Sequence, residues 1–315
     1  MTEAAAAPQI GDDLGDDIVL PFRTLRSGVI GRLVRLGPAI DTILSRHDMP
    51  VPVAQALGEA VALTTMLGAA LKFAGKLIVQ TKTDGIIDFL VVNFEAGGHV
   101  RGYARYDKRR FAELAASGAP IEQGALLGRG HLAITIDQGG DMDRYQGIVA
   151  LEGPTLAQCV HHYFRQSEQI ATGIKVAIEL QEDDRWRGGA LLVQRLPFEE
   201  RQVLEADREA IDDNWRRTLM LAGSSTSAEL TARDLDPDAL LYRLFHEDGV
   251  RVFRRHAVRA ECRCSRARIE RVLRSLPEVE RSNLGDADGT VTVTCEFCNR
   301  TYRFDAEAVA AIASA

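Results

Sequence analysis

The chain has 315 residues, of which 46% are hydrophobic and 26% are charged, and its formal net charge at pH 7 is -7. These values are typical of a soluble globular protein of one to three domains, and the negative charge argues against a general electrostatic attraction to nucleic acid. The first residues are acidic and lack the basic start and apolar run of a secretory signal. We therefore expect a cytoplasmic protein with an acidic flexible tail at residues 1–20.

Residues 21–197 have the pattern of a mixed domain of helices and strands. Residues 27–36 alternate apolar and other side chains as a strand does, and residues 38–44 form a short helix that begins at a proline. An apolar run then predicts a long helix over residues 51–73, closed by Gly75. Its apolar stretch is shorter than the roughly 20 residues that span a bilayer, so we expect a buried central helix and no membrane partner.

Several strands follow this helix. The dipeptides Asp84-Gly85 and Gly97-Gly98 are typical of hairpin turns, which indicates an antiparallel meander. A helix is predicted from residue 155 to about 167. Strands mixed with long helices favour an α+β fold over a doubly wound parallel sheet. The expected strands cover residues 77–80, 86–93, 100–106, 132–136, 145–151, 174–180 and 190–194.

Residues 198–250 are rich in charge and carry apolar side chains at loose helical intervals. This pattern indicates several short amphipathic helices, which we expect to form a helical linker. The break at residues 223–227, Gly-Ser-Ser-Thr-Ser, suggests low intrinsic stability. We predict that this linker is a conditionally stable latch over the preceding domain.

Four of the five cysteines lie in the last segment, residues 251–315. Cys262 and Cys264 form a CxC pair, and Cys295 and Cys298 form a CxxC pair. Two closely spaced pairs supply the four soft ligands of a tetrahedral zinc site, and clustered cysteines in the cytoplasm favour metal or redox chemistry. The fold class is therefore predicted as α+β, with an N-terminal mixed domain, a helical linker and a small C-terminal zinc-binding domain.

The unit around the cysteines is so short that a metal or disulfides are expected to stabilise it. Its thin core is predicted to contain Ile269, Val272, Leu273, Leu276, Val291, Val293, Phe297, Tyr302 and Phe304. Arg263, Arg266, Arg268 and Arg300 are near enough in sequence to offset the charge of four thiolates around one Zn²⁺, and arginines also favour the reactive thiolate. A structural zinc clamp and a redox sensor both fit these residues. Spacing alone favours the structural clamp.

The chain resembles the heat-shock protein 33 family, the redox-regulated 33 kDa chaperonins, over nearly all of its length after the acidic tail. The resemblance rests on both cysteine pairs and on motifs that include Arg144-Tyr145-Gln146-Gly147, Leu151-Glu152-Gly153, Tyr163-Phe164-Arg165-Gln166-Ser167-Glu168-Gln169 and Leu241-Tyr242-Arg243-Leu244-Phe245-His246-Glu247. It implies an ATP-independent holdase for unfolded client proteins, inactive with one zinc bound and active after oxidation and partial unfolding. It also implies Cys262–Cys264 and Cys295–Cys298 disulfides, and we expect a homodimer when the protein is activated.

Other functions are less well supported. An arginine-rich zinc module could bind nucleic acid, but Glu261, Glu270, Glu278 and Glu280 interrupt its positive charge. A thiol oxidoreductase using the CxxC pair would need a thioredoxin-like βαβ pattern, which does not precede it. The GxGxxA match at residues 128–133 leads into a strand instead of a helix, so we infer a turn. His161-His162 beside Cys159 falls within a helix, where adjacent side chains point apart. We expect no enzymatic activity.

Overall fold

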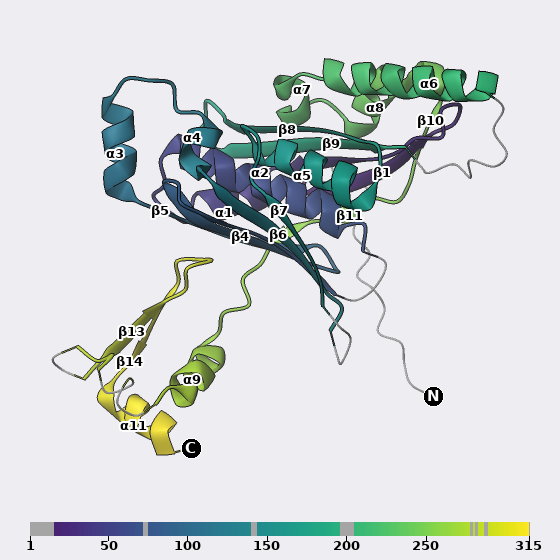
Figure 1. The fold of residues 1–315 in the computed structure, drawn as a ribbon. Coiled ribbons are helices and arrows are strands. Elements are labelled where there is room, and N and C mark those ends of the chain that lie inside the picture. Colours follow the sequence, from purple (N-terminus) through teal and green to yellow (C-terminus); the bar gives the residue numbers. More distant parts are fainter. Residues whose placement is uncertain are drawn as a thin grey trace, which may run out of the picture.

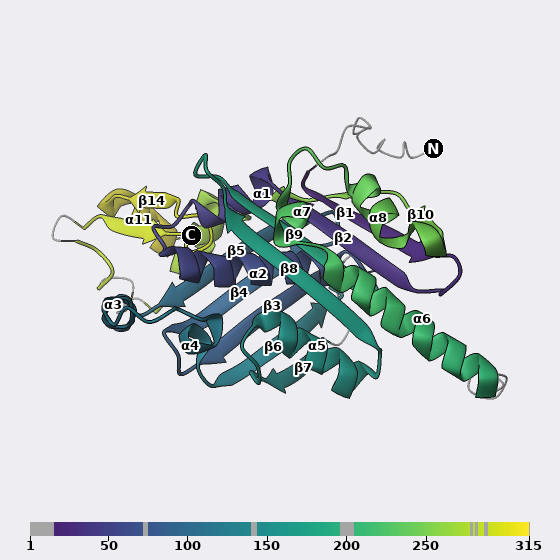
Figure 2. The same cartoon turned by 90° about the horizontal axis from the view of Figure 1, so that it is seen from above.

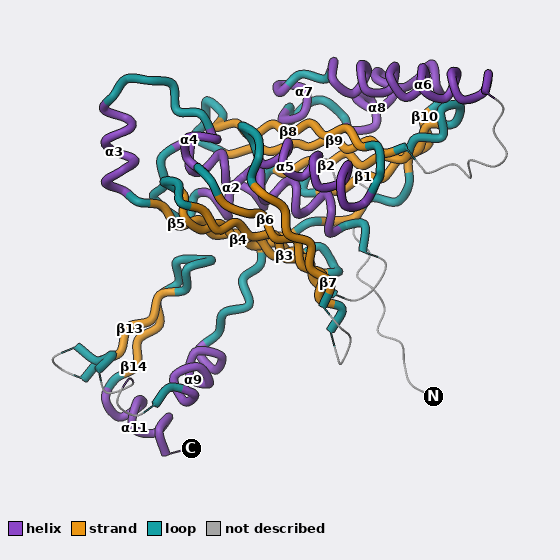
Figure 3. Tube along the Cα trace, in the orientation of Figure 1, coloured by secondary structure: helices purple, strands orange, loops and turns teal. Residues whose placement is uncertain are grey.

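The computed structural model describes residues 16–314 apart from 72–74, 140–143, 196–204, 278–279, 281–282 and 287–288. It confirms the α+β fold class: two largely antiparallel sheets enclose a layer of helices, and a small unit with its own two-stranded sheet follows at the C-terminal end (Figure 1). Figure 3 shows the same division by element type, with the C-terminal unit apart from the two large sheets.

The first sheet has the strand order β10-β1-β2-β9-β8, and β11 also pairs with β1. All of its pairings are antiparallel. The residues of β9 are all buried, because helices cover this sheet on both faces. The strands are β1 (Ile18–Thr24), β2 (Ile30–Leu36), β8 (Thr172–Leu180), β9 (Trp186–Gln194), β10 (Val250–Val252) and β11 (His256–Ala257).

The second sheet has the order β12-β5-β4-β3-β6-β7. Its strands are antiparallel except for β12, which runs parallel to β5. The predicted meander is thus present. The strand predicted at residues 145–151 is also present and forms the edge of this sheet next to β6. The strands are β3 (Lys76–Thr83), β4 (Ile87–Glu95), β5 (His99–Tyr106), β6 (Gly130–Asp137), β7 (Tyr145–Ala150) and β12 (Arg259–Ala260).

Helix α2 (Val51–Gly68) lies between the two sheets and packs on strands of both (Figures 1 and 2). It is long and apolar enough to cross a membrane, but 72% of it is buried inside the protein, as in a core helix. Helix α1 (Pro38–Leu44), as predicted, and helix α5 (Leu156–Tyr163) share its layer. The largest core cluster joins this layer to the inner faces of both sheets.

Three helices cover the outer face of the first sheet, in the region predicted as the linker (Figure 1). They are α6 (Glu205–Ser224), α7 (Ser227–Thr231) and α8 (Pro237–Phe245), followed by the short helix η3 (His246–Asp248). Thr226, within the predicted break, caps α7 through a capping box with Glu229. The core beneath these helices includes the fully buried Leu230, Leu240 and Phe245.

The C-terminal unit contains α9 (Arg266–Ser275), β13 (Val291–Thr294), β14 (Thr301–Phe304) and α11 (Ala306–Ser314). Among its described residues, the core has four buried side chains, Leu273, Val291, Phe304 and Ile312, with a few half-buried neighbours. The thin core expected from the sequence is therefore present, although α11 extends it beyond the residues predicted.

Several expectations need correction. Residues 18–20, which the sequence assigned to the tail, are buried in β1, because β1 lies inside the first sheet between β2 on one side and β10 and β11 on the other. The central helix ends at Gly68, where glycine's low helix propensity favours a stop, so Gly75 does not close it. Residues 72–74 lie outside the described part of the chain. Helices α3 (Lys108–Ala116) and α4 (Gln123–Leu127) were not predicted. Val272 is 56% exposed and does not belong to the C-terminal core.

Candidate metal centre

The four clustered cysteines meet at one point. Cys262 and Cys264 lie in the segment between β12 and α9, and Cys295 and Cys298 lie in the turn between β13 and β14. All four Sγ atoms are within 4.8 Å of one another. The Sγ atoms of Cys262 and Cys295 are 3.7 Å apart, and those of Cys264 and Cys298 are 3.2 Å apart. The structure thus brings together the two pairs that the sequence singled out.

The β13–β14 hairpin shapes the CxxC half of the cluster. The backbone amides of Cys298 and Asn299 both donate to the carbonyl oxygen of Cys295, at 3.3 and 2.8 Å. Asn299 has a φ of 55°, a left-handed conformation that asparagine tolerates better than most residues. This tight turn directs both thiols of the pair toward the same side.

The phenol of Tyr302, on β14, donates to Cys264 Sγ at 3.2 Å. Burial would raise the pKa of Cys264, but hydrogen bonds from Tyr302 and the neighbouring thiols lower it to about 7. Burial is the main cause that raises the pKa of Cys298 to about 12, and hydrogen bonds to the neighbouring sulfur atoms raise it further.

The cluster fits a tetrahedral metal ion. Four sulfurs at about 2.3 Å from one ion would lie roughly 3.8 Å apart, which the observed separations approach. The donor set is soft and can become fully anionic, and the Tyr302 hydroxyl orients one ligand from outside the set. The four cysteines can hold a metal ion with small adjustments of their side chains.

The arginines near the cluster have diverse partners. Arg263 forms an ion pair with the buried Glu95 of β4, and Arg266 pairs with Glu270 at 3.2 Å. Arg268 donates to the carbonyl oxygen of Arg263 at 3.1 Å. The pKa of Arg300 is raised chiefly by its hydrogen bond with Tyr302, and also by the negative charge of Cys264 and Cys298.

The fifth cysteine is separate from this cluster. Cys159 is buried on α5, its thiol donates to the carbonyl oxygen of Glu152 at 3.8 Å, and burial raises its pKa. The neighbouring His161 is exposed, so the two side chains do not point to a common site. Among the described residues, the four C-terminal cysteines form the group suited to a metal.

The CxxC turn also contacts the second sheet of the core. The ring of Phe297 packs under the guanidinium of Arg101, whose Cζ is 4.2 Å from the ring centroid, and lies 6.4 Å from the ring of Tyr103. Asn299 Nδ2 donates to the carbonyl oxygen of Arg46 at 3.0 Å. Phe297, which the sequence placed in the core of the C-terminal unit, instead joins that unit to β5, because its position in the turn points it outward.

Two buried arginines of the first sheet that bind the linker were not identified from the sequence. Arg35 of β2 is 1% exposed and donates to the carbonyl oxygens of Glu229, Ala232 and Leu235 in the linker. Arg187 of β9 donates to the carbonyl oxygen of Thr231 at 2.6 Å. The only available signal was a charged residue within an otherwise apolar strand pattern, which does not identify its partner.

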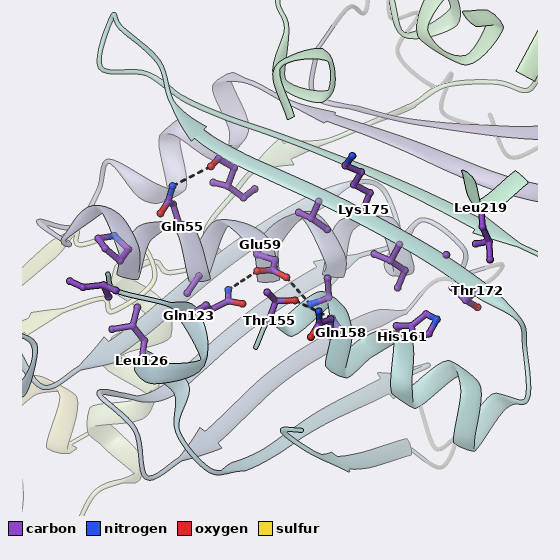
Figure 4. A pocket seen from close by; sticks show the side chains of 18 residues that line it. Gln55, Glu59, Gln123, Leu126, Thr155, Gln158, His161, Thr172, Lys175 and Leu219 are labelled. Carbon is purple, nitrogen blue, oxygen red and sulfur yellow. Dashed lines mark hydrogen bonds between the residues drawn. The ribbon is translucent and has the colours of Figure 1, made fainter. Parts of the chain in front are cut away.

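A cavity of about 610 Å³ lies between α2, α5 and β8 (Figure 4). Glu59 at its floor accepts hydrogen bonds from Gln123 Nε2 at 2.6 Å and from the backbone amide of Ala157 at 2.7 Å. Lys175 at its rim donates to the carbonyl oxygens of Gly223 and Ser225. These polar groups connect structural elements, so we assign no catalytic role to the cavity.

The fold and the site define a two-sheet α+β protein whose small C-terminal unit carries a four-thiol centre. The model of the family described as Hsp33 protein matches residues 17–305, and the chain belongs to this family. A 33 kDa chaperonin of Caulobacter vibrioides is 42% identical over 305 residues, covering 94% of this chain and 98% of the relative. One of Pseudomonas paraeruginosa is 38% identical over 283 residues, covering 90% and 89%.

A solved structure shares the fold. The crystal structure of a 33 kDa chaperonin from Thermotoga maritima, a heat shock protein 33 homolog, has a TM-score of 0.77 against this protein at 19% identity. The match covers 95% of this chain and 98% of that chain. The overall fold is therefore common to distant sequences.

Proposed function

We propose that this protein is a cytoplasmic, ATP-independent holdase chaperone that a redox switch controls. The observation that carries the proposal is the four-thiol cluster, which lies in a unit whose described residues include only four that are buried in its core. A unit so thinly packed has little stability apart from its ligand-mediated cross-link. The state of the thiols would then decide whether the unit is folded.

The reduced protein binds one Zn²⁺ through Cys262, Cys264, Cys295 and Cys298. Structural zinc contributes on the order of 10 to 16 kcal/mol in small peptides, which exceeds the total stability of many domains. The soft donor set and the tetrahedral size of the cluster support zinc over harder cations such as Mg²⁺. When bound, the ion neutralises thiolate charge and cross-links the two cysteine pairs.

Oxidation consumes the thiol ligands in pairs. Two thiols and one hydrogen peroxide give one disulfide and two water molecules, so two peroxides oxidise the whole set. In the folded cluster the shortest sulfur contacts run between the pairs, as from Cys264 to Cys298. We nevertheless propose Cys262–Cys264 and Cys295–Cys298 disulfides. Once the unit has unfolded, closing the shortest loops costs the least conformational entropy, and these two pairs close the shortest loops. Cys159 stays reduced because it is buried in the core.

Loss of the C-terminal unit releases the linker helices from the first sheet. Leu240, Leu244 and Phe245 of α8 are at most 3% exposed, and each contributes about 1.5 to 3 kcal/mol when buried. Their exposure, together with that of the sheet face beneath, creates an apolar surface that an unfolded client can cover. Binding then needs no ATP, and we propose that the active form is a homodimer.

The decisive experiment measures zinc content and suppression of client aggregation on the same sample, before and after peroxide at elevated temperature. We expect one zinc per chain and no suppression before oxidation, and no zinc with strong suppression afterwards. Cys295→Ser should lose zinc and suppress aggregation without oxidant. Cys159→Ser is the matched control and should behave like the unchanged protein. Retention of zinc by an oxidised, active sample would refute the switch.

A further inference from the structure

A single connecting segment covers one edge of each of the two large sheets. This segment, residues 250–261, is called the strap here; it runs from the linker helices to Cys262 and contains β10, β11 and β12. Without it, β1 would be the edge strand of the first sheet and β5 the edge strand of the second. Figure 1 shows β10 and β11 beside β1, before the chain descends to the C-terminal unit.

The strap binds the edge of β1 in antiparallel fashion. The backbone amide of Phe253 donates to the carbonyl oxygen of Pro21 at 2.9 Å, and the amide of Val258 donates to that of Asp17 at 2.7 Å. Pro21 has no amide hydrogen of its own, a common feature of edge strands. Exposed edges pair readily with other extended chains, so the strap protects this one.

The strap binds the edge of β5 in parallel fashion. The amide of Arg259 donates to the carbonyl oxygen of Gly98 at 2.8 Å, and the amide of Glu261 donates to that of Val100 at 3.1 Å. Gly98 has a φ of 88°, and a Cβ atom there would lie 1.9 Å from the carbonyl oxygen of Ala257. Only glycine allows so close an approach of the two backbones.

Few side chains of the strap are buried in this attachment. Of its twelve residues, all of them described, only Val258 is buried, at 3% exposure. Val252 and Phe253 are 40% and 45% exposed despite being apolar. Main-chain hydrogen bonds attach the strap to both sheets, and Val258 inserts into the main core cluster. Two ion pairs add to them, from Glu261 to His99 of β5 at 2.6 Å and from Arg255 to Asp238 of α8. Recognition through main-chain hydrogen bonds depends on an extended backbone much more than on a particular sequence.

We propose that the edges of β1 and β5, once the strap is released, bind extended segments of non-native polypeptide by strand addition. This inference rests on the proposed holdase function and assigns a client-binding surface to it. The partner is an unfolded chain that offers free backbone amides and carbonyls, with a small apolar side chain for the Val258 position. The strap is thus an internal occupant of the client site while the thiol centre keeps its C-terminal end in place.

The test uses a fluorescent peptide of residues 249–261 and the oxidised full-length protein. Val258→Asp weakens the protein's own strap by burying a charge, and Val258→Ala is a milder second variant. Peptide with N-methyl groups on the amides of Arg259 and Glu261 should bind at least about tenfold more weakly, because two hydrogen bonds are lost. A methyl group on the intervening Ala260 amide, which points away from β5, should leave affinity nearly unchanged.

Reduced and carboxymethylated α-lactalbumin, a permanently unfolded chain, serves as the competing client. We expect it to displace the unmodified peptide from the oxidised protein. Equal binding of the two methylated peptides, or failure of the unfolded chain to compete, would overturn the inference even in a protein that suppresses aggregation. Absence of aggregation suppression after oxidation would instead overturn the proposed function, so the two failures are distinguishable.

Discussion

At the residue scale, Phe297 couples the thiol centre to the core. Its neighbour Glu296 also reaches the second sheet, where it accepts a hydrogen bond from Tyr103 at 3.4 Å. His47 lies beside Tyr103, with ring centroids 5.8 Å apart, and burial lowers its pKa. A neutral imidazole of His47 is thus favoured next to the turn. The interface between the CxxC turn and the second sheet includes aromatic packing and one cation–π contact.

Phe297→Ala should weaken the attachment of the C-terminal unit while leaving its metal content intact. The lost contacts with Arg101 and Tyr103 are worth about 1 to 2 kcal/mol, and no thiol is removed. Hydrogen exchange in β12 should accelerate, with zinc content unchanged. Val272→Ala, which shortens an exposed side chain of α9, is the control and should have neither effect. Unchanged exchange in Phe297→Ala would mean that this contact contributes nothing to docking.

At the element scale, helix α8 is the best-packed part of the linker. Leu240 is fully buried against the first sheet, whereas Tyr242, two residues later, is 65% exposed. Leu240→Ala should cost about 2 to 5 kcal/mol and loosen the linker, giving partial aggregation suppression in the reduced, zinc-bound protein. Tyr242→Ala should remain inactive when reduced. If both variants stayed inactive while Leu240→Ala was measurably destabilised, linker release would not be the step that exposes the client surface.

Helices α2, α4 and α5 meet at Glu59, and burial raises the pKa of this carboxyl group. A raised pKa in the folded state favours the protonated form, so its stabilising contribution is present below the unfolded value and is lost as pH rises through the folded value. Glu59→Gln should therefore gain stability relative to the unchanged protein as pH increases above about 4.3. Thermal unfolding midpoints across this range measure the difference.

Glu113→Gln, on the exposed face of α3, is the matched control for Glu59→Gln. Its midpoint should follow that of the unchanged protein at every pH. A constant offset between Glu59→Gln and the unchanged protein would indicate that only the hydrogen bonds of Glu59 matter, and its ionisation would then have no role in stability.

At the scale of the whole molecule, the proposed switch acts in order on the thiol centre, then on the strap and linker, and then on the first sheet. Oxidation should remove hydrogen-exchange protection from the C-terminal unit and from α6 to α8 together. Helix α2 should stay protected, because it is enclosed between both sheets. Full protection of the linker in an oxidised protein that already suppresses aggregation would contradict this order of events.

The sequence was sufficient for features that depend on local patterns. The alternating strands and the central apolar helix were predictable because each repeats with the period of its own backbone conformation. The hairpin at Gly97-Gly98 was predictable because glycine readily adopts the positive φ that such turns need. The grouping of Cys262, Cys264, Cys295 and Cys298 was predictable because two close pairs need only one loop closure to meet. The α+β fold class followed from the order of these elements.

Only the tertiary structure decided how these elements cover one another. The sequence shows that Arg35 interrupts an apolar strand, but its linker partners lie about 200 positions away along the chain. Phe297 fits the core of its own unit equally well by hydrophobicity, and its actual contact with Arg101 depends on how that unit docks. The strap has no strong strand pattern, because main-chain hydrogen bonding carries no side-chain signature. Long-range contacts of this kind have no periodicity in the sequence, so they become visible only when the chain has folded.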